Sequence, residues 1–194
     1  SAQLGDGALT GEWRFVSLRY AQSARTVAQP EVASGAMQFD GAGGMTSGQV
    51  RGPYLVQGDG RVAFASPSDG ARMVEGGLSP ELGLMTALSP ASDLAFDLLV
   101  ALAAPGAAFD PARVSGAYIA MVLLSSPFDA TASLVAVAGF EAAQSQSTFG
   151  ADGRGGFRFP ASTGLGDLAF DAFASENGDC LAGSFQSFGF DGIF

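Results

Sequence analysis

The five residues Asp93-Leu94-Ala95-Phe96-Asp97 return without change as Asp167-Leu168-Ala169-Phe170-Asp171. In each copy Leu and Phe alternate with Asp, Ala and Asp, and this period of two is typical of a β-strand that buries one face. In the first copy the apolar positions continue through Leu98, Val100 and Leu102. We therefore expect two amphipathic strands whose carboxylates lie on the solvated face.

Two further motifs occur once in each half of the chain. A glycine followed two residues later by an aromatic residue is found in Gly11-Glu12-Trp13 and in Gly116-Ala117-Tyr118. An Asp-Gly pair followed by arginine is found in Asp59-Gly60-Arg61 and in Asp152-Gly153-Arg154. Because Asp-Gly is favoured in tight hairpin turns, the paired motifs predict a degenerate two-fold repeat of antiparallel β structure.

The repeat divides the 194 residues into two β units. The first covers residues 1–103, the second covers residues 114–194, and the Ala-, Pro- and Gly-rich residues 104–113 form the linker. The 28 glycines and the 47% hydrophobic content fit an all-β chain with many turns and a sizeable core. We expect an antiparallel barrel or packed barrel-like sheets, with the two units either separate or joined in one continuous domain.

One predicted strand covers residues 12–20. Trp13 and Phe15 lie at odd positions and so on one face of the strand, whereas Val16 and Leu18 lie at even positions and so on the other face. A change of phase within a strand is what a β-bulge produces, so we expect a bulge at this point. The same alternation predicts that the two arginines of the strand, Arg14 and Arg19, face water.

The charge of the chain excludes several classes of partner. The formal net charge is −10, and all nine basic residues are arginine because the chain has no lysine and no histidine. Such a chain repels phosphate backbones and anionic bilayers, so we expect no nucleic-acid partner. The longest apolar run, from Leu98, ends at Pro105 and is too short for a transmembrane helix. Cys180 is the single cysteine, so no internal disulfide forms.

The residue types present also limit the chemistry. Without histidine or lysine, a Ser-His triad, a Cys-His dyad, a Schiff base and a histidine metal site are excluded. The paired carboxylates Asp93/Asp97 and Asp167/Asp171 have the right type for acid–base catalysis, but their parity indicates a solvated face. We therefore predict no catalytic residue, no cofactor and no metal. Five aspartates in Gly-rich turns are the candidates for calcium, although hairpin turns explain them more simply: Asp40, Asp59, Asp69, Asp152 and Asp179.

Three segments of the first half resemble the bacterial lipocalin-like family. They are Gly11-Glu12-Trp13-Arg14-Phe15-Val16-Ser17, the Gly35-x-Met37-x-Phe39-Asp40-Gly41 pattern, and Tyr54-Leu55-Val56-Gln57-Gly58-Asp59-Gly60-Arg61-Val62. The second half, with Gly116-x-Tyr118 and Phe149-x-x-Asp152-Gly153-Arg154-Gly155, resembles repeats of uncharacterised exported bacterial β proteins. The resemblance implies a calycin-type barrel with an apolar interior.

These observations favour a non-enzymatic exported β-barrel protein that binds a small apolar ligand. Five residues are predicted to line the site: Trp13, Phe15, Phe39, Tyr54 and Phe96. The alternative is a structural or accessory subunit of a cell-surface or multi-protein assembly, which interacts with protein partners, or with further copies of itself, through strand edges. The start at Ser1-Ala2-Gln3, without methionine, suggests cleavage of a signal peptide and export to the periplasm or cell surface.

Overall fold

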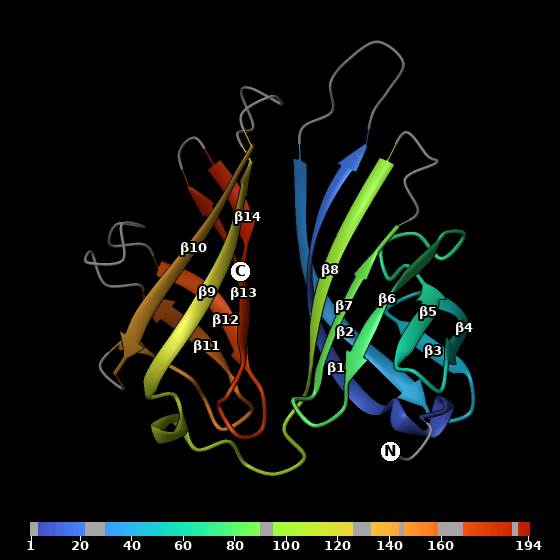
Figure 1. Cartoon of the computed structure of the whole chain (residues 1–194), viewed down its shortest axis with the longest axis horizontal. Helices are drawn as coiled ribbons and strands as arrows, with labels where there is room; N and C mark the ends of the chain where they lie inside the picture. Colours follow the sequence, from blue (N-terminus) through green and yellow to red (C-terminus); the bar gives the residue numbers. More distant parts are fainter. Residues whose placement is uncertain are drawn as a thin grey trace.

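The computed structural model (Figure 1) contains a β-barrel and a second β-sheet that stands beside it. It describes residues 4–21, 30–89, 95–125, 133–143, 146–158, 169–187 and 190–194. In these ranges the helical structure consists of two 3₁₀ turns, η1 Asp6–Ala8 and η2 Pro111–Arg113. None of the described helices has the length and apolar character needed to cross a membrane.

The first eight strands form a closed antiparallel barrel in chain order, and β1 pairs with β8 to close it. This confirms the predicted all-β antiparallel barrel. Tight turns join most of the strands, and Gly60 (φ +87°) and Gly83 (φ +58°) take up backbone conformations that side chains disfavour. The strands are β1 Thr10–Ala21, β2 Pro30–Asp40, β3 Gly44–Ser47, β4 Val50–Val56, β5 Arg61–Ala65, β6 Met73–Ser79, β7 Leu84–Leu88 and β8 Ala95–Ala103.

The remaining strands form a six-stranded antiparallel sheet, called here the second sheet, in the order β10-β9-β14-β13-β12-β11. The C-terminal segment contains the two paired strands β13 and β14, in which Phe185 lies opposite Gly192. One face of the second sheet covers its own apolar core, which includes Val122, Phe157 and Phe170. Its strands are β9 Gly116–Ser125, β10 Ser133–Ala142, β11 Arg154–Arg158, β12 Ala169–Ala174, β13 Leu181–Ser187 and β14 Phe190–Ile193.

The other face of the second sheet packs against the outside of the barrel. Val16, Leu18 and Leu102 of the barrel form one buried cluster with Phe173 and Ile193 of the sheet. In Figure 1 the strands nearest the barrel are β13 and β14, which contact β1 and β2. The barrel strands β1 and β8 are therefore covered on both faces, by the barrel interior on one side and by the second sheet on the other.

This two-sided burial explains why the predicted bulge is wrong. β1 pairs with β2 without interruption from Thr10↔Asp40 to Tyr20↔Pro30, so its phase does not change. Trp13 and Phe15 point into the barrel, whereas Val16 and Leu18 face the second sheet. Both parities of the strand are apolar because both faces are buried.

Candidate functional site

The interior of the barrel is filled with apolar side chains. The Phe39 ring packs edge-on against the rings of Trp13, Tyr54 and Phe64, with centroid separations of 6.4, 5.0 and 6.1 Å. Aromatic pairs favour this geometry in protein cores. Four of the five residues predicted to line a ligand site lie in this cluster and are at most 5% exposed: Trp13, Phe15, Phe39 and Tyr54.

One end of the barrel is closed by η1. The Tyr54 hydroxyl lies 2.9 Å from the backbone oxygens of Asp6 and Leu9 and donates to them. The Asp6 carboxylate in turn accepts a 2.8 Å hydrogen bond from the backbone N–H of Val56. Burial, together with the nearby carboxylates of Asp40 and Asp6, raises the pKa of Tyr54. The hydroxyl therefore stays protonated and fastens η1 across this end.

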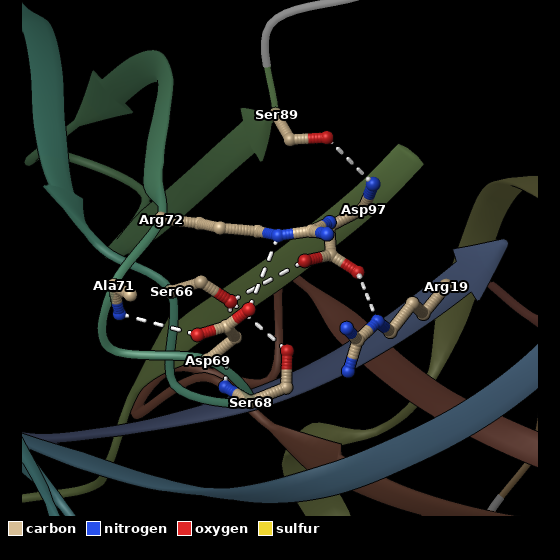
Figure 2. Close-up of polar contacts among 8 residues, drawn as sticks. All are labelled: Arg19, Ser66, Ser68, Asp69, Ala71, Arg72, Ser89 and Asp97. Carbon is tan, nitrogen blue, oxygen red and sulfur yellow. Dashed lines mark hydrogen bonds and ion pairs between the residues drawn. The ribbon is translucent and has the colours of Figure 1, made fainter. Parts of the chain in front are cut away.

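Polar side chains gather at the other end of the barrel (Figure 2). Asp97 is 2% exposed, and its Oδ2 accepts a 3.3 Å hydrogen bond from the Ser66 hydroxyl. Its Oδ1 lies 3.8 Å from Nε of Arg19, and its backbone N–H donates to the Ser89 hydroxyl at 2.8 Å. The expectation of a solvated Asp97 and a solvated Arg19 is wrong, because the opposite face of β8 packs against the second sheet. Phe96, the fifth predicted residue, precedes Asp97 on β8, and its side chain lies outside the described residues.

Several polar atoms at this end have unused hydrogen-bonding capacity. Arg72 pairs through Nε with Asp69 at 3.1 Å. Within the described chain, four buried atoms have no hydrogen-bond partner: Ser17 Oγ, Arg19 Nε, Arg72 Nη1 and Asp97 Oδ1. Buried polar atoms are normally paired with protein or with ordered water. This end of the barrel can therefore accept water or another small polar group.

The two repeated carboxylate motifs are not brought together. Asp97 lies inside the barrel, whereas Asp171 is exposed on β12 of the second sheet. Asp93 and Asp167 lie outside the described residues. The described carboxylates of the two motifs therefore have different environments, and they form no acid–base pair.

Four of the five aspartates in the Gly-rich turns accept hydrogen bonds from backbone N–H groups of their own turns, namely Asp40, Asp59, Asp69 and Asp152. Asp40 accepts 2.8 Å hydrogen bonds from the N–H groups of Ala42 and Gly44, and these bonds lower its pKa. Asp59 likewise accepts from the backbone and the side chain of Arg61, and its pKa is also lowered. Across the described ranges, no three His, Cys, Asp or Glu side chains are grouped so that they could hold a metal ion.

An apolar groove of about 490 Å³ lies between the barrel wall and the second sheet. We call it the groove. Its barrel side carries Leu84 and Leu88 of β7 with Leu98 and Val100 of β8, and its sheet side carries Ile119, Met121 and Leu123 of β9. It lies beside the buried cluster that joins the two units, and Ile193 lines it as well as belonging to that cluster.

The walls of the groove are unusually exposed for large apolar side chains. Ile119 is 83% exposed, Met121 is 57% exposed and Leu88 is 45% exposed. On a protein surface, large apolar side chains gathered in this way mark a ligand or interaction site. Along β9, Ala120 and Val122 face the core of the second sheet, whereas Ile119 and Met121 face the groove.

The polar groups along the groove are few. Its charged residues are Glu75 of β6 and Asp179 of the turn before β13, and both are exposed. The Tyr118 hydroxyl donates to the backbone oxygen of Gly178. Burial raises the pKa of Tyr118 and the pKa of the Cys180 thiol, and the Asp179 carboxylate adds to both shifts.

A second, more polar groove of about 430 Å³ lies between β1 and the sheet strands β11–β13. Arg14, expected to face water, is 8% exposed here. Its guanidinium bonds the Glu12 carboxylate at 3.1 Å and the backbone oxygen of Asp152. The outward face of β1 thus places Arg14 against the second sheet, where it links the two units.

Comparison with protein-family models, with curated proteins and with solved structures gave no match. Among the features above, the groove between barrel and sheet combines volume, apolar walls and access from solvent.

Proposed function

We propose that this protein binds a small apolar ligand, and that the ligand lies in the groove between the barrel and the second sheet. The observation that carries the proposal is the exposure of Leu88, Ile119 and Met121 around a space of about 490 Å³. Ligand pockets commonly have volumes of roughly 300–1,000 Å³ and mostly apolar walls. We also propose that the protein acts outside the cytoplasm, because the absence of lysine, the net charge of −10 and the 28 glycines are typical of exported bacterial β proteins.

The barrel interior supports this function less well than the groove. Phe39 and Phe64 are at most 1% exposed, and their rings already contact each other. A small closed barrel whose interior is filled by its own side chains has little space for a ligand. A ligand in the groove would not have to displace core side chains, because the walls of the groove already face solvent.

The single cysteine gives a direct test. Cys180 lines the groove, so a bound ligand should shield its thiol from iodoacetamide. The reaction is followed at mildly alkaline pH, because the pKa of this thiol is raised. With 1-decanol at about ten times its dissociation constant, the labelling rate should fall about tenfold.

Two matched variants test whether decanol protects Cys180 by binding in the groove. Leu88→Asp places a charge in the apolar wall and should abolish protection by decanol. Leu55→Asp changes a residue of similar exposure, 52% against 45%, that does not line the groove, and it should leave protection intact. An undiminished labelling rate with decanol, or equal protection in the Leu88→Asp variant, would overturn the proposal.

A second candidate function is supported by strand β10. In the described chain β10 pairs with β9 alone, so its other edge is open. Its ten residues contain one charge, Glu141, and Val137 is 68% exposed. Natural edge strands usually carry charges, prolines or bulges that prevent pairing. We infer that β10 is suited to pair with β10 of a second copy, as in an accessory or structural subunit.

Sedimentation velocity over a range of concentrations tests this second candidate. Antiparallel pairing of two β10 strands about a two-fold axis would give a dimer. Val137→Lys should dissociate the dimer, because the two lysines lie close together at such an edge, whereas Leu55→Lys should not. A wild-type protein that remains monomeric at all concentrations would exclude this mode of assembly.

A further inference from the structure

The charged groups of the groove are all acidic. Glu75 and Asp179 are the charged residues that line it, and no arginine does so. Arg113 contacts the same turn as Asp179, but its guanidinium donates to the backbone oxygen of Glu176 at 2.8 Å and to Asn177 Oδ1 at 3.4 Å. The arginine is therefore engaged with the turn and is not directed into the groove.

Aromatic rings also line the groove, and the Tyr118 ring lies close enough to Asp179 to feel its charge. Tyr118 and Phe140 line the groove and stack with a centroid separation of 5.7 Å and an interplanar angle of 15°. Phe194 is a third ring in the lining. The Tyr118 hydroxyl proton is already donated to Gly178, so the oxygen remains available as an acceptor. Aromatic faces and carboxylates together attract organic cations.

From this arrangement we propose that the ligand of the groove is an apolar ammonium compound, with a hydrocarbon body and one cationic nitrogen. The inference rests on the proposed function, because it concerns the same groove. A fatty-acid carboxylate would instead bring a third negative charge near Glu75 and Asp179 without a cation to pair with it. The net charge of −10 also attracts cations and repels anions at longer range.

Three probes with the same ten-carbon chain separate charge from apolar contact: decylammonium, 1-decanol and decanoate. Binding is measured by isothermal titration calorimetry at neutral pH and low salt, where the amine is protonated and the acid is ionised. Decylammonium should bind about tenfold or more tightly than decanoate, with decanol between them.

Substitution of the two acids tests the source of this preference. In the double variant Glu75→Gln/Asp179→Asn, decylammonium should bind no more than about threefold more tightly than decanoate. Glu81→Gln removes an exposed carboxylate from the β6–β7 turn, which does not line the groove, and should leave the ratio of the two affinities unchanged.

The outcomes distinguish the two proposals. Equal affinity for all three probes, or a preference that survives the double variant, would overturn the ammonium proposal and leave binding in the groove intact. If none of the three probes binds, the proposed function is itself overturned, and the ammonium proposal falls with it.

Discussion

Substitution of Phe39 by alanine tests whether the barrel interior is a filled core. Phe39 is 1% exposed, and its ring contacts the rings of Trp13, Tyr54 and Phe64. Removal of a fully buried phenylalanine ring from a close-packed core costs about 3–5 kcal/mol of unfolding free energy. Because three rings would lose their partner, we expect Phe39→Ala to fall in this range.

Urea unfolding followed by tryptophan emission measures the effect in the barrel itself. Trp13 is the only tryptophan, and its ring lies 6.4 Å from that of Phe39. Phe39→Leu keeps part of the volume and should lose less stability than Phe39→Ala. Ile119→Ala serves as the surface control, because this side chain is 83% exposed and its loss should change stability by no more than about 0.5 kcal/mol.

A small effect would refute the reasoning. If Phe39→Ala lowers the unfolding free energy by less than about 1 kcal/mol, the ring is not close-packed. The interior would then have room for a ligand, and the site predicted from Trp13, Phe15 and Tyr54 would again be the better candidate. A loss of about 3–5 kcal/mol of unfolding free energy would support the interpretation that the barrel interior is a filled core.

Three further predictions concern single contacts. Asp97→Asn should lower the unfolding free energy by about 1–3 kcal/mol in urea titrations, because Arg19, whose Nε lies 3.8 Å from Oδ1 of the buried Asp97, loses the opposite charge. Gly76→Ala should destabilise strongly, because its Cβ would lie 1.8 Å from the Thr86 oxygen, whereas Gly77→Ala, with nothing within 4 Å, should be neutral or slightly stabilising by the same measurement. The folded-state pKa of Asp40 is below its ordinary value of 3.8, so its stabilising contribution is present above that pH and is lost as pH falls through the folded pKa. The unfolding free energy should therefore fall less steeply with decreasing pH in the Asp40→Asn variant than in the wild-type protein.

The barrel could be predicted because its signals are local. Period-two alternation and Asp-Gly turns such as Asp59-Gly60 act over a few residues, and these are enough to predict antiparallel strands. The direction in which each strand faces is not local. In β8, Asp97 alternates with the apolar residues Leu98 and Val100. From this alternation alone Asp97 was expected to face solvent. In the structure Leu98 and Val100 face the second sheet, and Asp97 lies inside the barrel.

The groove could not be predicted from the sequence for the same reason. The apolar run at residues 118–124 and the alternation after Phe96 were both visible, and each indicated buried surface. Only the packing of the two units places Leu98 and Met121 on opposite walls of one space. Contacts of this kind depend on tertiary arrangement, which strand periodicity does not specify.

The chain contains five methionines, which provide the most direct test of where the ligand binds. Met37, Met45 and Met85 are buried in the barrel interior, Met121 lines the groove, and Met73 is 40% exposed and lines neither. Methyl spectra of protein labelled with ¹³C at the methionine methyl groups, recorded during a titration with 1-decanol, report all of these positions together. We expect the Met121 signal to shift while the three interior signals stay in place. Shifts at Met37, Met45 and Met85 with an unchanged Met121 would contradict the account and place the ligand inside the barrel.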